Sequence, residues 1–158
     1  MTEQNTQVAS LDAEGEFAAD YIEELLDIAD LDGDLDIAVK NDRVYLTVDS
    51  STDDLVALSK PDVVAALQEL TRAAVLTGVG NHSRLILDIA GSRSSREREL
   101  EQLVERASTR IAEGAREVAL PPMSSYERKL VHDLVFAQGL TSESRGEGRD
   151  RHTVVLPK

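Results

Sequence analysis

The chain has 158 residues, of which 41% are hydrophobic and 3% aromatic, so one domain or two small domains with aliphatic cores can form. It contains no cysteine, which excludes disulfides and thiolate metal sites. The net charge of −13 opposes nucleic-acid binding. The charge is unevenly distributed, however: residues 1–90 carry 5 Lys/Arg and 19 Asp/Glu, and residues 91–158 carry 12 Lys/Arg and 11 Asp/Glu. Most of the cations therefore lie in the second half of the chain.

Neither a membrane span nor a secretory signal is predicted. No apolar run approaches the roughly 18 residues that a span requires. Residues 1–10 are polar and lack a basic segment, so we expect a cytoplasmic protein. Residues 1–15 show no apolar periodicity, which predicts a disordered acidic tail.

Residues 16–91 alternate between helical and extended patterns of apolar side chains. The predicted order is helix, strand, strand, helix, helix, strand, over residues 16–29, 35–39, 44–48, 53–60, 62–76 and 84–89. Asn41 and Asp42 tolerate left-handed backbone geometry, so the two strands around them are expected to form a hairpin. Gly78 and Gly80 are expected to end the longer second helix.

Residues 92–158 are predicted to form a second small domain of the same α+β class. Its predicted elements are a helix from Ser94 to 113, a strand over 117–120, a helix from Ser124 to 137, and a hairpin over 140–145 and 153–156. Both helices start with capping-box spacing, a serine followed three residues later by glutamate. The arginines of the first helix alternate with glutamates, which favours an ion-paired surface over a phosphate track.

The helix after Pro121 and Pro122 carries Arg128 and His132, which lie one turn apart on the same face. The predicted core-facing residues of this helix are Tyr126, Leu130, Val131 and Leu134, with Val135 at the edge. Arg128 and His132 are therefore expected at the border between core and solvent. The arginine fork can hold a phosphate, and imidazole can bind a phosphate or stack on an unpaired base. The alternative is that both residues only line the rim of an amphipathic helix.

The pattern Pro-x-x-x-x-Tyr-Glu-Arg-x-x-x-His, followed by Ser-Arg-Gly-Glu-Gly and a final Val-Val-Leu-Pro-Lys, resembles the Jag family of SpoIIIJ-associated proteins. The resemblance covers residues 16–158 and is most specific in the second half. It implies a KH-like domain over 16–91 and an Arg-x-x-x-His domain over 92–158 that binds single-stranded nucleic acid.

The sequence departs from the family pattern in the KH-like half. A KH domain clamps the nucleic-acid backbone with a Gly-x-x-Gly loop, and this chain has Leu58-Ser59-Lys60-Pro61 instead. Both glycines are missing, and three aspartates surround Lys60. We therefore expect a KH-like fold whose nucleic-acid cleft is lost or weakened, with a substituted but working loop as the alternative.

The resulting hypothesis is a non-enzymatic protein that binds single-stranded RNA, in preference to DNA, through its C-terminal domain. The expected contacts are Arg128 and His132, with added attraction from Lys129, Arg145, Arg149 and Arg151. The alternative for the last three arginines is a solvated turn. Sequence selectivity should be poor, because Tyr126 and Phe136 are the only aromatic residues of that half.

The alternative function is a protein-interaction adaptor with little nucleic-acid binding. The resemblance implies a role in cell elongation, cell shape, division or membrane-protein insertion, with a small KH protein or a second copy of the chain as partner. An enzyme is not expected, because neighbouring His132 and Asp133 point apart on a helix and no P-loop or nucleophile motif occurs. No cofactor or metal site is predicted.

Overall fold

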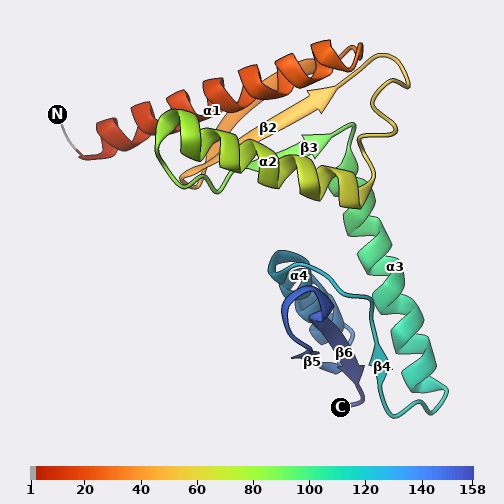
Figure 1. Cartoon of the computed structure of the whole chain (residues 1–158). Helices are drawn as coiled ribbons and strands as arrows, with labels where there is room; N and C mark the ends of the chain where they lie inside the picture. Colours follow the sequence, from red (N-terminus) through yellow and green to blue (C-terminus); the bar gives the residue numbers. More distant parts are fainter. Residues whose placement is uncertain (1–2) are drawn as a thin grey trace. The chain divides into compact units, whose positions relative to one another are not determined.

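The computed structural model describes residues 3–158, and their side chains from Gln7 onward. The chain divides into two compact units, Met1–Ser94 and Ser95–Lys158, a division three residues after the predicted boundary at Gly91. The described residues form four α-helices and two three-stranded sheets, so the predicted α+β class is confirmed (Figure 1). Within residues 3–158, no helix combines the length and apolar character that crossing a membrane requires.

The first unit is a three-stranded sheet covered on one face by two helices (Figure 1). Its elements are α1 (Glu3–Ile28), β1 (Asp34–Lys40), β2 (Arg43–Asp49), α2 (Pro61–Val79) and β3 (Ile86–Ile89). β2 lies in the centre, antiparallel to β1 and parallel to β3. Val44, Leu46 and Val48 alternate along β2 and are fully buried under the helices, because successive side chains of a strand point to opposite faces.

The predicted hairpin between the first two strands is confirmed. Lys40 pairs with Arg43, which leaves Asn41 and Asp42 as a two-residue loop. Both have positive φ, 51° and 54° respectively. This is the backbone geometry of the tight turn that matches the natural twist of paired strands.

The predicted disordered tail over residues 1–15 is wrong for the described part of that segment. Helix α1 begins at Glu3 and continues without a break to Ile28. Glu14 is only 5% exposed and accepts a hydrogen bond from Ser83, while Asn81 donates to Ser10. The N-terminal part of α1 is thus held by contacts with residues far along the chain, which the local sequence pattern does not reveal. Residues 1–2 lie outside the described residues.

The segment before α2 forms a single hydrogen-bonded turn rather than the separate helix of the predicted order. The N–H groups of Leu58 and Ser59 donate to the carbonyl of Leu55, whose side chain is 1% exposed. α2 then starts at Pro61. Proline fits that first helical position, because its missing N–H would have had no helical partner there.

The end of α2 differs slightly from the prediction. Gly78 lies inside the helix. The ring of Phe17 packs against its backbone at the place where the Cβ of any other residue would stand, so only glycine fits there. Gly80, with φ of 86°, supplies the left-handed residue at the helix end. The two glycines therefore have different roles, one in close packing and one in termination.

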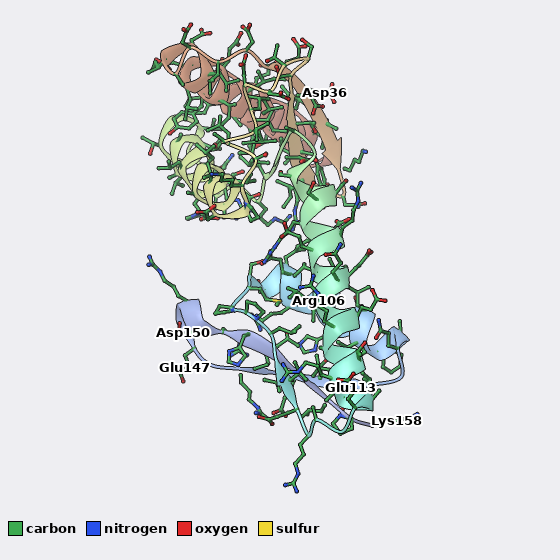
Figure 2. The ribbon with its side chains drawn as sticks, turned by 90° about the vertical axis from the view of Figure 1, so that its right-hand side faces the viewer. Asp36, Arg106, Glu113, Glu147, Asp150 and Lys158 are labelled. Carbon is green, nitrogen blue, oxygen red and sulfur yellow. The ribbon has the colours of Figure 1, made fainter. Side chains whose placement is uncertain are left out.

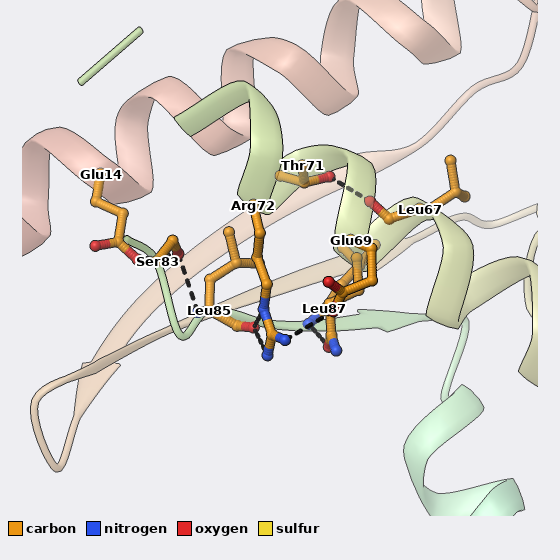
Figure 3. A network of polar contacts seen from close by, with 9 residues as sticks. Glu14, Leu67, Glu69, Thr71, Arg72, Ser83, Leu85 and Leu87 are labelled. Carbon is orange, nitrogen blue, oxygen red and sulfur yellow. Dashed lines mark hydrogen bonds and ion pairs between the residues drawn. The ribbon is translucent and has the colours of Figure 1, made fainter. Parts of the chain in front are cut away.

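The outer edge of β3 is occupied by side chains of α2 (Figure 3). Arg72 donates from Nε and Nη2 to the Leu85 carbonyl at 3.0 and 2.8 Å. Gln68 accepts the Leu87 N–H through its side-chain oxygen at 3.1 Å. These bonds fasten α2 to the sheet and satisfy backbone groups that an edge strand would otherwise expose.

The second unit packs two helices against an antiparallel sheet in the order β4-β6-β5 (Figure 1). Its elements are α3 (Ser92–Ala112), β4 (Val118–Ala119), α4 (Ser125–Ala137), β5 (Thr141–Arg145), the 3-10 helix η1 (Gly148–Asp150) and β6 (His152–Leu156). Its core is aliphatic and comprises Leu100, Val104, Ala107, Ile111, Val118, Leu120, Val131, Val135 and Val155. The predicted terminal hairpin is confirmed by the pairing of β5 with β6.

The predicted start of the first C-terminal helix at Ser94 is wrong. α3 begins at Ser92, whose hydroxyl donates to Asp88 and accepts the Ile89 N–H. Asp88 also accepts the backbone N–H of Arg93 at 3.2 Å. The carboxylate at the end of β3 thus satisfies a free N–H of the first helical turn, which local capping spacing did not indicate.

Candidate nucleic-acid interface

The helix α4 begins where its capping residues predict. The Ser124 hydroxyl accepts the Glu127 N–H at 3.3 Å, and the Glu127 carboxylate accepts the Ser124 N–H at 2.8 Å. This reciprocal pair satisfies two N–H groups that have no partner within the helix. The helix ends before Gly139, which has φ of 75° as predicted for a left-handed terminator.

Glu127 also joins α4 to α3. Its carboxylate lies 2.7 Å from Nε of Arg96, and Arg96 contacts Glu99 at 2.9 Å. Burial alone would raise the pKa of Glu127, but hydrogen bonds from Arg96 and from the Ser124 backbone outweigh it, and the pKa falls below its ordinary value. The ionised carboxylate therefore stabilises the start of α4.

The buried face of α4 is rotated from the predicted one. Val131 and Val135 are fully buried, whereas Tyr126 is 52% exposed. Leu130 and Leu134 pack only at the periphery of the core. The core centres on Val131 and Val135 because α4 faces the sheet with that side. Arg128 and His132 nevertheless lie at the predicted border, both half-buried.

Arg128 and His132 converge on two serines of β5. Ser144 accepts a hydrogen bond from Nη1 of Arg128 at 3.0 Å and lies 3.1 Å from Nε2 of His132. Ser142 lies 2.6 Å from Nδ1 of His132. The two serines are separated by one residue, so they lie on the same face of the strand, toward α4. We call Arg128, His132, Ser142 and Ser144 the four-residue cluster.

Arg128 keeps donor capacity within this cluster. Its Nε is buried and has no hydrogen-bond partner among the described residues, and no described carboxylate forms an ion pair with its guanidinium. A guanidinium has five N–H donors, and among the described side chains only the Ser144 bond occupies one here. The arrangement is a positive, partly desolvated group that no described carboxylate neutralises, which suits an anionic ligand.

Arg145 differs from Arg128 in that its charge is already paired. Its guanidinium contacts the carboxylates of Glu117, at 3.0 Å, and of Glu143. The hydrogen bonds to these two carboxylates raise the pKa of Arg145. The two carboxylates neutralise the charge of Arg145, a residue that the sequence predicts to contact nucleic acid.

The other predicted cations are exposed. Lys129 follows Arg128 on α4, and Arg149 lies in η1; neither forms an ion pair with a described residue. Arg151 donates weakly to the Gly146 carbonyl at 3.3 Å. Figure 2 shows the side chains of this loop, with the acidic Glu147 and Asp150 labelled. The loop therefore presents both signs of charge rather than a purely basic surface.

The segment expected in place of a Gly-x-x-Gly loop lies in the first unit. Leu58 packs against the core, and Ser59 donates to the Val56 carbonyl at 2.9 Å. Lys60 is exposed at the start of α2, and Pro61 is the first helical residue. The segment thus carries side chains at all four positions, whereas a Gly-x-x-Gly loop brings bare backbone to a phosphate.

The sequence did not single out Ser142 and Ser144 as site residues. The signal that could have found them is their spacing: two hydroxyls at alternate positions of a predicted strand lie on one face. That strand pairs Ser142 with Val155 of the core, which turns this face inward. The pairing register was needed to see which residues meet Arg128 and His132.

Residues 98–157 match the family model of the Arg-x-x-x-His (R-3-H) domain. The chain is 29% identical to the RNA-binding protein KhpB of Lactiplantibacillus plantarum over 87% of this chain and 42% of the relative. It is 27% identical to KhpB of Bacillus subtilis over 75% and 58%, and 25% identical to KhpB of Clostridium symbiosum over 89% and 65%. The resemblance to the Jag family is confirmed.

The match to the Arg-x-x-x-His domain contains the whole four-residue cluster. It begins at Arg98 in α3 and extends past β6, so both helices and all three strands of the second unit contribute to it. The N-terminal unit, residues 1–94, lies outside this match, but the similarity to KhpB of Lactiplantibacillus plantarum covers 87% of the chain and so includes most of this unit. The chain spans between 42% and 65% of the length of these three relatives.

Proposed function

We propose that the chain is a non-enzymatic protein that binds single-stranded RNA through its Arg-x-x-x-His domain. The observation that carries the proposal is the meeting of Arg128 and His132 on the serines of β5, with no described carboxylate neutralising Arg128. The KhpB relatives are named as RNA-binding proteins, which supports RNA as the ligand. The half-buried position of both side chains favours an extended strand that lies along α4.

The chemistry of the contact follows from the donors. A phosphate oxygen accepts from the Nη N–H groups of Arg128 that Ser144 does not occupy, since the Nε group is buried. A second oxygen accepts from the imidazole of His132 when that ring carries a proton on the facing nitrogen. The serine hydroxyls can rotate to accept or donate, so they adjust to the bound phosphate. Lys129, Arg149 and Arg151 add attraction that carries no sequence information.

The proposal predicts that Arg128→Ala combined with His132→Ala weakens binding to a short single-stranded RNA by roughly tenfold or more, since charge-assisted hydrogen bonds are lost. Fluorescence anisotropy titrations at two salt concentrations measure this loss and the salt slope. Arg106→Ala is the charge-matched control, because Arg106 is exposed on α3 and outside the four-residue cluster. Equal losses in the control and the double variant would contradict the proposal.

A second candidate function is a protein-interaction adaptor in cell elongation, division or membrane-protein insertion. The observation that favours it is the N-terminal unit, which is acidic and has Leu58 and Pro61 where phosphate-binding glycines would be required. Lys60→Ala in the same titration separates the two roles. An unchanged affinity supports a docking function for the N-terminal unit, and a loss equal to that of the double variant assigns it to RNA binding.

A further inference from the structure

Phe136 is a fully apolar side chain in an unusually exposed position. It is 82% exposed, although Val131 and Val135 on the same helix are completely buried. A single exposed apolar side chain is common on protein surfaces, so the position of the ring relative to the proposed site carries the argument. The ring lies in the last turn of α4, within the Arg-x-x-x-His domain.

The position of Phe136 relative to the proposed site is defined by helix geometry. Arg128, His132 and Phe136 are each four residues apart, so they form one ridge along α4. Each step advances about 6 Å along the axis and turns about 40°. Lys129 lies beside this ridge and is exposed. Two cationic or polar groups and one aromatic ring thus follow one another along an inclined ridge that turns about 80° around the helix from Arg128 to Phe136.

We propose that Phe136 is the stacking platform for one unpaired base of the strand whose phosphate Arg128 and His132 hold. This inference rests on the proposed function and adds a base contact to it. Every base has a π-face, so stacking on an aromatic ring tolerates any sequence while it excludes paired bases. The ridge therefore supplies both parts of single-strand recognition, with charge for the backbone and a ring for the base.

The competing occupant is an apolar side chain of a protein partner. Shape and aromaticity separate the two: a base requires the flat face of a ring, whereas an apolar partner is served by any side chain of similar volume. Phe136→Leu keeps apolar character and removes the flat face. Phe136→Trp keeps and enlarges the face. Neither substitution changes charge, so the electrostatic part of binding is held constant.

The first experiment measures anisotropy of a labelled single-stranded RNA with the full chain. Phe136→Leu should weaken RNA binding roughly tenfold, and Phe136→Trp should bind RNA as tightly as the wild type or more tightly. The salt slope should stay unchanged, because no phosphate contact is lost. An abasic sugar–phosphate strand of the same length should bind the wild type and Phe136→Leu equally.

The second experiment uses the absence of tryptophan from the chain. Phe136→Trp introduces one indole, whose fluorescence should be quenched when RNA with bases is added and not when the abasic strand is added. Ala137→Trp is the matched control, since Ala137 is exposed and lies about 100° around the same helix. Its fluorescence should change little with either strand.

The outcomes distinguish this inference from the proposed function. If Phe136→Leu binds RNA as tightly as the wild type while Arg128→Ala does not, the stacking role is overturned and the phosphate site stands. If Phe136→Leu weakens binding to the RNA and to the abasic strand alike, the ring supports structure and not a base. If the wild type binds neither strand, the proposed function fails, and the stacking role fails with it.

Discussion

At the scale of single residues, the proposed site contains hydroxyl groups as well as charges. His132 has one ring nitrogen near Ser142 and the other near Ser144, at 2.6 and 3.1 Å. Both ring nitrogens therefore face hydroxyl groups of β5, so the balance between the two tautomers depends on the strand as well as on α4. Ser144 also contacts Arg128, so one hydroxyl orients both groups that are proposed to hold the phosphate.

We expect Ser144→Ala to weaken RNA binding several-fold by releasing both Arg128 and His132, since a hydrogen bond of this kind contributes about 1 kcal/mol. Nitrogen-15 NMR of the His132 ring should show a changed tautomer ratio in the same variant. Thr141→Val is the control, because Thr141 lies on the same strand and bonds instead to the Pro157 carbonyl. A Ser144 variant with unchanged ring signals would remove the positioning role.

The sequence identified Arg128 and His132 because helical spacing is visible along the chain. It could not identify Ser142 and Ser144 as their partners, because that contact depends on how β5 pairs with β6 and faces α4. The helix side of the four-residue cluster was therefore predictable, and its strand side was not.

At the scale of elements, local sequence patterns again predict some features, while others depend on tertiary contacts. The capping pair of Ser124 and Glu127 is local, and α4 starts where it indicates. The start of α3 at Ser92 and the long α1 depend instead on partners from other elements, such as Asp88 for Ser92 and Ser83 for Glu14. Local patterns predict element types well, but tertiary contacts can extend or shift their ends.

The contact between α3 and α4 makes a pH dependence testable. The folded-state pKa of Glu127 is lowered, so its contribution to stability is present above the unfolded value of about 4.5 and is lost as pH falls through the folded value. Urea unfolding of the full chain should therefore show a falling free energy of unfolding on acidification below that value.

Glu127→Gln should flatten this part of the pH profile, because the replaced side chain cannot titrate. Glu101→Gln is the matched control, as Glu101 is exposed on α3. Profiles of the wild type and Glu127→Gln that run parallel through this range would contradict the assignment.

At the scale of the whole molecule, charge is divided between the two units. The first 90 residues carry most of the excess acidity, and the near-neutral remainder contains the four-residue cluster. Within that remainder, Glu117 and Glu143 neutralise Arg145. We therefore expect the proposed affinity for RNA to be limited by local carboxylates as well as by the number of cations.

Replacing Glu117 and Glu143 together by glutamine should tighten RNA binding several-fold at low salt, because Arg145 becomes available and repulsion falls. Glu101→Gln with Glu105→Gln gives the same change in net charge on exposed positions of α3. The gain should be larger for the first pair in anisotropy titrations. Equal gains would show that only overall charge matters.

The fastening of α2 to β3 has a consequence for self-association. A bare sheet edge is a template on which a second chain can grow into an aggregate, yet Arg72 and Gln68 already occupy the Leu85 carbonyl and the Leu87 N–H. A foreign strand could dock there only by displacing a guanidinium and an amide. The N-terminal sheet is therefore shielded from fibril-like stacking on one flank, while β1 relies on its charged Asp34, Asp36 and Lys40 on the other.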